Sequence, residues 1–309
     1  MMHIGRAGSS ACPLARMLST NVAVSPRVQL LRQRFAVEAL SPQDFIAGKP
    51  MPVAPDRSSA RADKTATHAD HSVARAAVEL RRQDIPAAAA TPFVDPALSD
   101  RFMRNHTYLR ISLTERCSLR CVYCMPENGV DLTPDARLLR TDEMMRIARL
   151  LVNAGVNKIR LTGGEPTVRR DLPEIVGGLN TLRPNGLRQI ALTSNGIALP
   201  RMLPSLVLNG LDRLNISIDT LDRDRFIKIT RRDGLPRVLE AIDLALELGL
   251  APLKLNCVLM AGVNDDELLA LAELSRARPI DVRFIEYMPF DGNRCGDARW
   301  VPRSASKCL

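Results

Sequence analysis

The sequence of 309 residues contains only four histidines, and the last of them stands at position 106. Hydrolases that use a Ser-His or Cys-His pair need an imidazole as general base. Because the regular structure predicted below begins near Phe102, almost all of it lacks histidine. The sequence therefore argues against such a hydrolase and favours chemistry that needs no imidazole.

Aromatic residues are also scarce, at 4% of the chain, and none lies between Tyr123 and Phe226. This argues against the stacking platforms that bind single-stranded nucleic acid. No apolar run approaches the length of a membrane span. We therefore expect neither nucleic acid nor a membrane as partner, and the formal charge of +9 suits an anionic small substrate.

Cysteine is present seven times, an odd and unevenly spread set that does not resemble a disulfide framework. A reducing compartment is the better prediction. Residues 1–37 contain five arginines and no acidic residue, as in a mitochondrial transit peptide, and this predicts a location in the matrix. The alternative is a basic arm without that role. Residues 38–101, rich in Ala, Pro, Asp and Arg, are predicted to be a disordered linker.

From residue 102 to 293 the pattern predicts six strands that alternate with helices. The strands are expected at 108–113, 158–161, 189–192, 214–218, 253–260 and 282–287. The helices are expected at 142–152, with Thr141 as cap, and at 172–182, 202–208, 226–229, 238–248 and 267–275. Such alternation requires a parallel sheet, and six units predict an α/β fold, an incomplete (β/α)6 TIM-like barrel. Its ligands should lie at the carboxyl ends of the strands.

The loop after the first strand carries Cys117, Cys121 and Cys124 in the spacing C-x3-C-x2-C. Three thiolates can hold three irons of a four-iron cluster and leave the fourth iron open to a small molecule. A structural zinc site is the alternative, but it needs four ligands. Cys257 could be offered as the fourth, yet it stands among apolar residues of a strand and is predicted to be a buried apolar cysteine.

This cysteine motif, with an aromatic residue before its last Cys, resembles the radical S-adenosylmethionine superfamily. The stretch Gly163-Gly164-Glu165-Pro166 matches the GGEP element of that family. The resemblance implies that the open iron binds S-adenosylmethionine, which is cleaved to a 5′-deoxyadenosyl radical. It also implies that the GGEP element contacts the methionine amino group through backbone carbonyls and the Glu165 side chain.

Several further motifs resemble the molybdenum cofactor biosynthesis protein A family, the GTP 3′,8-cyclases, and most closely their animal mitochondrial form. The matching stretches lie at 109–114, 158–166, 192–196, 215–221 and 283–289. The resemblance implies a lyase that takes hydrogen from ribose C3′ of GTP and joins C3′ to guanine C8. It also implies that the nucleotide is contacted by Arg110, Arg160, Thr193 and Lys254. The positions that it implies for S-adenosylmethionine are Tyr123, Gly163, Gly164, Glu165, Ser217 and Met288. Cationic side chains at strand ends suit a triphosphate on physical grounds as well.

The resemblance stops after Asn293, and residues 294–309 are predicted to be a divergent tail. The family carries a second 4Fe–4S cluster on a C-x2-C pair and a further cysteine in a C-terminal region, and Cys295 and Cys308 do not form that pattern. We therefore expect a C-terminally truncated member with one cluster and impaired cyclisation. The expected partners are GTP, an electron donor, a homodimer mate and the downstream cyclic pyranopterin monophosphate synthase.

Three other interpretations remain open from the sequence. The chain could be another single-cluster radical S-adenosylmethionine enzyme, although the cations at 110, 160 and 254 favour a triphosphate substrate. It could be a regulatory or interaction protein that retains the fold without turnover. The most distant alternative is a zinc-binding module, which about four irons per chain would exclude.

Overall fold

The computed structural model describes residues 68–83 and 94–288. The chain divides into two units, and every described residue belongs to the second, Lys64–Leu309. The predicted transit peptide, most of the predicted linker and the predicted tail therefore lie outside the described residues. Within the described residues, no helix combines the length and apolar character needed to cross a bilayer.

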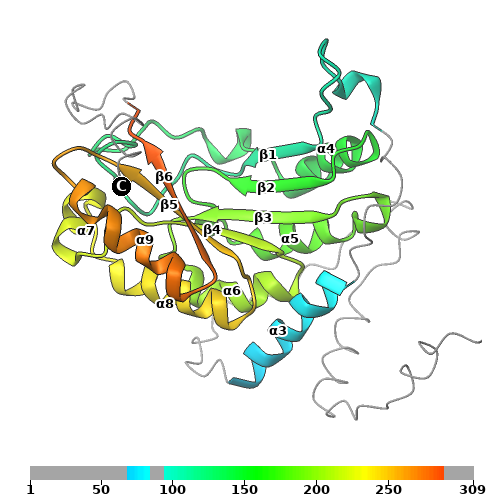
Figure 1. Cartoon of the computed structure of the whole chain (residues 1–309). Helices are drawn as coiled ribbons and strands as arrows, with labels where there is room; N and C mark the ends of the chain where they lie inside the picture. Colours follow the sequence, from blue (N-terminus) through cyan, green and yellow to red (C-terminus); the bar gives the residue numbers. More distant parts are fainter. Residues whose placement is uncertain (1–67, 84–93, 289–309) are drawn as a thin grey trace, which may run out of the picture. The chain divides into compact units, whose positions relative to one another are not determined.

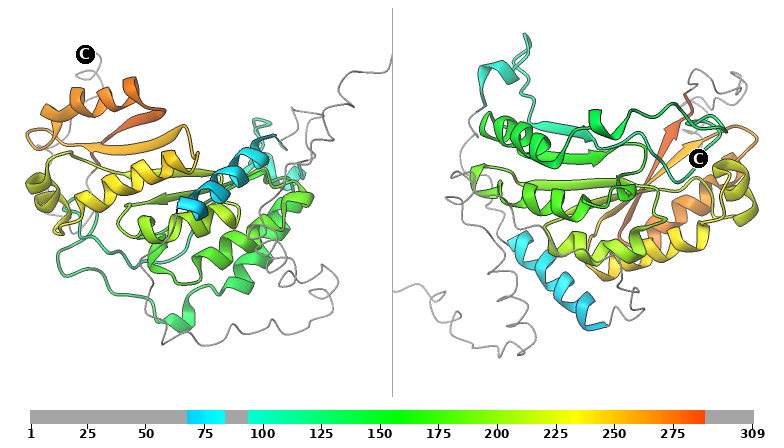
Figure 2. Two further views of the ribbon diagram at one scale, coloured as in Figure 1. Left: turned by 90° about the horizontal axis from the view of Figure 1, so that it is seen from below. Right: turned by 180° about the vertical axis from the view of Figure 1, so that it is seen from behind.

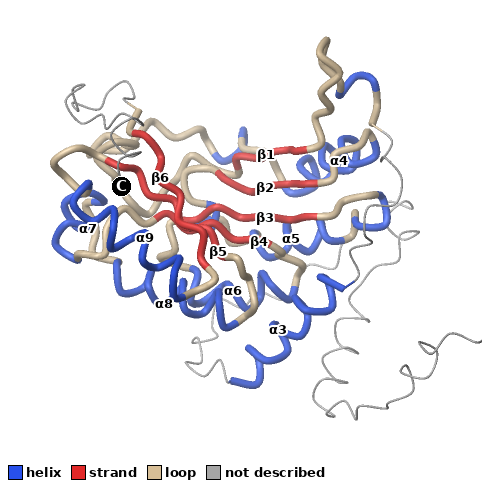
Figure 3. The backbone as a smooth tube through the Cα atoms, viewed as in Figure 1, coloured by secondary structure: helices blue, strands red, loops and turns tan. Residues whose placement is uncertain are grey.

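A six-stranded parallel sheet forms the centre of the second unit (Figure 1). Its strands follow one another in chain order, and each pairs in parallel with the next. They are β1 (Tyr108–Ser112), β2 (Lys158–Thr162), β3 (Gln189–Ser194), β4 (Arg213–Ser217), β5 (Leu253–Leu259) and β6 (Ile280–Glu286). Within the described part of the chain, β1 and β6 each pair with one strand only, so the sheet stays open. The predicted incomplete (β/α)6 barrel is confirmed, and Figure 3 shows its strands twisting from β1 to β6.

Helices connect the strands and pack side by side along one face of the sheet (Figure 2). They are α4 (Thr141–Asn153), α5 (Leu172–Asn180), α6 (Leu199–Leu208), α7 (Arg223–Thr230), α8 (Leu235–Glu247) and α9 (Leu268–Ala277). Short 3-10 turns are η2 (Pro96–Leu98), η3 (Asp135–Arg137), η4 (Pro166–Val168), η5 (Arg183–Asn185) and η6 (Asp265–Glu267). Every predicted strand and helix is present, with bounds that differ by a few residues. The expected cap, Thr141, is instead the first helical residue of α4, and its hydroxyl donates to Asp171 Oδ2 at 2.6 Å.

One segment contradicts the prediction of a disordered linker at 38–101. Residues His68–Gln83 form a helix, α3, which packs against α6. Ala74 and Val78 are buried in the main apolar core, and Arg81 Nη2 donates to the carbonyl oxygens of Val207 and Leu211 at 2.8 and 3.2 Å. The prediction failed because this helix offers few large apolar side chains, and its order depends on packing against distant residues.

Alternation along the strands separates the two faces of the sheet. Ile159, Leu161, Leu214 and Ile216 are fully buried against the helices. Because successive side chains of a strand point to opposite faces, the residues between them point to the concave face that the helices do not cover. That face is polar on every strand, and it carries the candidate site.

Candidate functional site

The three cysteines of the motif lie in the loop that follows β1. Cys117 and Cys121 are half-buried and Cys124 is exposed, and all three are free thiols. The backbone N–H of Cys124 and that of Met125 both donate to the carbonyl oxygen of Cys121, which makes a tight turn. Burial raises the pKa of each of the three thiols, and their mutual proximity raises the pKa values of Cys117 and Cys121 further. The loop thus gathers the three thiols at the carboxyl end of β1.

The donor set fits a cluster better than a single metal ion. Among the described residues, no three His, Cys, Asp or Glu side chains converge closely enough to hold one ion. A four-iron cluster needs no such convergence, because each thiolate binds a different iron. Cys257 is fully buried on β5, where its thiol donates to the carbonyl oxygen of Asp219 at 3.7 Å. The prediction that Cys257 is a buried apolar cysteine is therefore confirmed.

Gly163 and Gly164 allow the loop after β2 to touch the start of the cysteine loop. Gly164 N donates to Thr114 O at 2.6 Å, and Glu165 N donates to Arg116 O at 2.8 Å. A Cβ atom on Gly164 would stand 2.5 Å from Arg116 O, and one on Gly163, at φ 151°, would stand 2.6 Å from Thr114 O. No side chain fits at either position, so the glycine pair sets the distance between these two loops.

The carboxylate of Glu165 lies inside the protein, with 1% of the residue exposed. Its oxygens accept four hydrogen bonds, which come from Thr167 N, Thr167 Oγ1, Ser194 Oγ and Asn195 N at 2.6–3.0 Å. In this conformation Glu165 ties η4 to the end of β3. The contact of its side chain with the methionine amino group stays a prediction.

Tyr123 reaches from the cysteine loop to the end of β4. Its hydroxyl donates to Asp219 Oδ2 at 2.8 Å, while Asp219 Oδ1 accepts from Val258 N at 2.9 Å. Burial raises the pKa of Asp219 to about 6 and raises that of Tyr123 well above its usual value. Sequence reasoning gave Asp219 no role. Its partnership with Tyr123 shows that it positions the cysteine loop.

A second clamp holds the same loop from α7. Arg120 N and Val122 N donate to the carbonyl oxygens of Thr230 and Ile229 at 3.0 and 2.9 Å. Arg231, which ends α7 at φ 57°, also donates to the Arg120 carbonyl oxygen at 3.2 Å. The cysteine loop is therefore fixed at both sides of the open end of the barrel.

The remaining two S-adenosylmethionine candidates lie at strand ends on the far side of the sheet. Ser217 is the last residue of β4, half-buried, and is paired in register with Asn256 of β5. Met288 follows β6 and is 59% exposed. Both therefore stand at the carboxyl ends of strands, the same end of the sheet that carries the cysteine loop.

The four nucleotide candidates lie on the concave face. Arg110 and Arg160 are register partners on β1 and β2. Arg160, only 8% exposed, donates from Nε to Tyr108 Oη at 2.9 Å and from Nη1 to Thr193 Oγ1 at 3.0 Å. Lys254 Nζ stands 3.8 Å from Asp281 Oδ2. The structure thus brings Arg110, Arg160 and Thr193 together, with Lys254 on a strand farther along the sheet.

Lys158 and Arg283 are among the cations of this face to which sequence reasoning gave no role. Burial and then repulsion from Arg160 lower the pKa of each. The positive charge of this face also acts on Tyr108. Burial alone would raise the pKa of Tyr108, but hydrogen bonds and charge from Arg110 and Arg160 lower it. Lys158 stands two residues before Arg160, so alternation along the strand could have revealed that both point to the same face. The register of Asn256 with Arg283 could have revealed the second cation.

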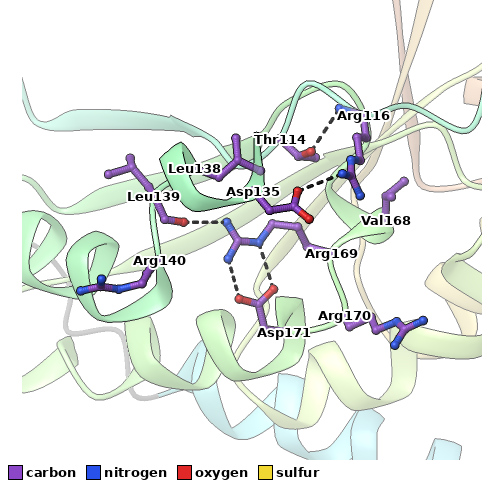
Figure 4. A pocket seen from close by; sticks show the side chains of 10 residues that line it. All are labelled: Thr114, Arg116, Asp135, Leu138, Leu139, Arg140, Val168, Arg169, Arg170 and Asp171. Atoms are coloured by element: carbon purple, nitrogen blue, oxygen red, sulfur yellow. Dashed lines mark hydrogen bonds and ion pairs between the residues drawn. The ribbon is translucent and has the colours of Figure 1, made fainter. Parts of the chain in front are cut away.

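A cavity of about 270 Å³ lies outside this face, between the cysteine loop, η3, the start of α4 and the start of α5 (Figure 4). Arg169 crosses it, donating to both oxygens of Asp171 and to the carbonyl oxygen of Leu139. Arg116 and Asp135 pair across its other wall at 2.9 Å. None of the predicted site residues lines this cavity. The Arg116–Asp135 ion pair in its wall holds the start of the cysteine loop against η3.

The open parallel sheet, the three-cysteine loop after β1 and the glycine pair after β2 together define a class of protein. The chain matches the radical SAM superfamily over residues 111–275 and belongs to that superfamily. Membership implies a 4Fe–4S cluster and S-adenosylmethionine.

Individual relatives narrow the class. The chain is 57% identical over 209 residues to the mitochondrial GTP 3′,8-cyclase of Arabidopsis thaliana, over 68% of this chain and 53% of the relative. It is 59% identical to molybdenum cofactor biosynthesis protein 1 of Drosophila melanogaster and 55% identical to that of Homo sapiens. These matches cover 66% and 72% of this chain and 36% and 35% of the relatives. The chain therefore spans about half or less of the length of these relatives.

Among solved structures, Streptococcus suis SuiB bound to S-adenosylmethionine is similar at 18% sequence identity and a TM-score of 0.49. The similarity covers 60% of this chain and 42% of that one.

Proposed function

We propose that the chain is a GTP 3′,8-cyclase. It would convert GTP to (8S)-3′,8-cyclo-7,8-dihydroguanosine 5′-triphosphate in the first step of molybdenum cofactor biosynthesis. The observation that carries the proposal is the cationic concave face, on which Arg110 and Arg160 pair in register two residues before β1 ends and leads into the cysteine loop. The names of the relatives, at 57% and 59% identity, point to the same reaction.

In this proposal Cys117, Cys121 and Cys124 hold the cluster. The residues assigned to S-adenosylmethionine are Tyr123, Gly163, Gly164, Glu165, Ser217 and Met288. When bound, the cluster and S-adenosylmethionine supply the radical chemistry. Glu165 would also hold the loop after β2 in shape, because its carboxylate oxygens accept four hydrogen bonds, from Thr167 of η4 and from Ser194 and Asn195 at the end of β3.

The residues assigned to the nucleotide are Arg110, Arg160, Thr193 and Lys254, to which we add Lys158 and Arg283. Burial, and after it repulsion from Arg160, lowers the pKa values of Lys158 and Arg283. A triphosphate supplies the missing negative charge, and guanidinium groups bind its oxygens in pairs. Thr193 holds Arg160 in place through its hydroxyl, so it orients the cation as well as offering a contact of its own.

The test is anaerobic reconstitution of the full chain with iron and sulfide, followed by incubation with GTP, S-adenosylmethionine and a chemical reductant. We expect about four irons per chain, which corresponds to one cluster. Cys121→Ser should abolish iron binding, and Cys257→Ser, at the buried cysteine, should preserve it. Formation of 5′-deoxyadenosine together with the cyclised nucleotide supports the proposal. An iron-loaded protein that forms neither with GTP would overturn it in favour of a non-catalytic or regulatory chain.

The number of clusters is a separate part of the proposal. Only one C-x3-C-x2-C set is present in the sequence, and Cys295 and Cys308 lack the C-x2-C spacing. We therefore propose one cluster in this chain. About eight irons per chain would contradict this.

We further propose that the chain acts in the mitochondrial matrix. The arginine-rich, acid-free composition of residues 1–37 supports this, as does the mitochondrial plant relative. Its partners would be an electron donor for the cluster, a second copy in a homodimer, and the cyclic pyranopterin monophosphate synthase that uses the product. Import of the full chain into isolated mitochondria tests the location, and a chain without residues 1–37 should remain outside.

A further inference from the structure

Asn215 is a buried polar residue in the middle of β4 that no role yet explains. The residue is 4% exposed, and its Oδ1 atom accepts no hydrogen bond. Among the described residues, the other buried side-chain atom without a partner is Arg81 Nε, whose guanidinium already donates to two carbonyl oxygens. Buried polar atoms are almost always satisfied, so an orphaned amide oxygen calls for a partner that the folded chain does not supply.

The strand pattern points this amide at the concave face. Its neighbours Leu214 and Ile216 are both buried in the core under the helices, so Asn215 projects to the other side of the sheet. The register places it between Thr193 of β3 and Lys254 of β5, two residues assigned to the nucleotide. Neither neighbour bonds to Oδ1: the Nζ atom of Lys254 is directed to Asp281, and the Thr193 hydroxyl is bonded to Arg160.

The chemistry of the orphaned atom restricts the part of the ligand that can meet it. An amide oxygen is an acceptor, so its partner must carry an N–H or O–H group. The oxygens of an ionised triphosphate are acceptors and cannot serve. A ribose hydroxyl can donate, and it is small enough to reach a buried position on a strand.

The position along the sheet leads to the same part of the nucleotide. Arg160, assigned to the triphosphate, binds Thr193, which is paired with Asn215. Ser217, assigned to S-adenosylmethionine, lies two residues farther along β4 on the same face. In the proposed reaction a hydrogen atom passes from ribose C3′ of GTP to the 5′-deoxyadenosyl group of S-adenosylmethionine, so the ribose must lie between these assignments, which is where Asn215 stands.

We propose that Asn215 is a positioning residue whose Oδ1 atom accepts a hydrogen bond from a ribose hydroxyl of the bound nucleotide. The inference rests on the proposed function and adds to it a contact that distinguishes ribonucleotides from their deoxy analogues. It also predicts which part of the substrate this strand fixes, since the cations fix the triphosphate and leave the ribose free to rotate.

The test compares equilibrium binding of GTP, 2′-deoxyGTP, 3′-deoxyGTP and inorganic triphosphate to the reconstituted full chain. Without reductant, no turnover interferes. We expect the wild-type chain to bind GTP about 5- to 10-fold more tightly than at least one deoxy analogue, the effect of one neutral hydrogen bond. Asn215→Leu, of similar volume, should bind GTP and that analogue equally well, with its affinity for inorganic triphosphate unchanged.

Two further variants protect the test against misfolding. Asn215→Asp keeps the acceptor and adds a negative charge, so both nucleotides should bind more weakly while the preference for GTP is at least that of the wild type. Gln189→Leu removes an amide from the start of β3, near Lys158 rather than Thr193 in register, and should leave the ratio unchanged. Thermal melting of each variant checks the fold independently.

The outcomes separate the inference from the proposed function. If the wild-type chain binds no GTP, the proposed function fails and the inference fails with it. If it binds GTP and both deoxy analogues equally well, Oδ1 is satisfied by water only and the inference alone fails. The inference alone also fails if Asn215→Leu retains the wild-type preference for GTP.

Discussion

Two glycines decide how closely the loop after β2 approaches the cysteine loop. At Gly164 the nearest backbone oxygens, of Glu115 and Arg116, would stand 2.5 Å from an added Cβ. These oxygens belong to backbone that is itself hydrogen-bonded, with Glu165 N bound to Arg116 O. A side chain there must therefore displace the start of the loop that carries Cys117, rather than a flexible neighbour.

We accordingly expect Gly164→Ala to lower the free energy of unfolding of the metal-free chain by about 1–3 kcal/mol, the usual cost of overpacking. It should also reduce the iron bound per chain, because the cysteine loop moves. Urea unfolding and iron analysis measure the two effects. Gly262→Ala is the reference: its φ of 66° strains an alanine, but no atom lies within 4 Å. Equal behaviour of the two variants would show that contact with the cysteine loop is not the cause.

Asp219 gives the fold a pH dependence of unusual sign for a carboxylate. Burial raises its pKa to about 6, against about 3.9 in an unfolded chain. Between these values the folded chain holds a proton that the unfolded chain releases. Its contribution to stability is therefore complete below about pH 4 and is lost as the pH rises through about 6. The groups that face it are Tyr123 and the thiols of Cys121, Cys124 and Cys257, whose pKa values are all raised.

We expect Asp219→Asn to remove a fall of roughly 3 kcal/mol in the free energy of unfolding between pH 4 and pH 7. Urea titrations of metal-free wild-type and variant chains at several pH values give this slope directly. The variant loses one acceptor, so its absolute stability will also change; the difference in slope is the readout. Identical slopes in the two proteins would mean that Asp219 ionises normally.

At the scale of elements, the strands were predictable and α3 was not. Parallel strands covered by helices are apolar at alternate positions, as in Ile159 and Leu161 or Leu214 and Ile216, and this signal lies within each strand. The order of α3 depends instead on partners more than a hundred residues away, such as the Val207 and Leu211 carbonyl oxygens that accept from Arg81. For the same reason, the motif revealed the cysteines, whereas the roles of Asp219, Lys158 and Arg283 became visible only when neighbouring strands were aligned.

The element that was missed carries a prediction of its own. Arg81 of α3 donates to two carbonyl oxygens near the end of α6 and lies 3.4 Å from Asp212. Arg81→Ala removes one donor from each of those carbonyl groups, although Gly210 N still donates to Val207 O. We expect a loss of about 1–3 kcal/mol in the free energy of unfolding. Arg75→Ala, on the exposed side of the same helix, should change it by less than about 0.5 kcal/mol. If both variants melt alike, α3 does not contribute to the stability of the barrel through this contact.

At the scale of the whole described unit, the sheet has two faces of opposite character. One face is apolar and covered by helices, and the other gathers cations from β1, β2, β4, β5 and β6. Lys254 is balanced by Asp281. Arg110, Lys158, Arg160 and Arg283 form no ion pair with an acidic side chain among the described residues, although Asp281 attracts Arg283 from a distance. The ligand-free face therefore repels itself, and an anion that binds there relieves the repulsion.

This leads to opposite effects of one substitution on binding and on stability. Arg283→Gln removes a cation whose pKa is lowered by burial and by Arg160, so the ligand-free chain should unfold no more easily than wild type. Its dissociation constant for GTP should nevertheless rise about 10-fold or more, the effect of losing one charge-assisted hydrogen bond. The dependence of GTP binding on salt should weaken as well, because one fewer charge attracts the triphosphate. Arg237→Gln, on the exposed outer face of α8, should change neither property. Binding isotherms at two salt concentrations and melting curves without ligand test both effects, and an unchanged GTP affinity in Arg283→Gln would remove Arg283 from the nucleotide site.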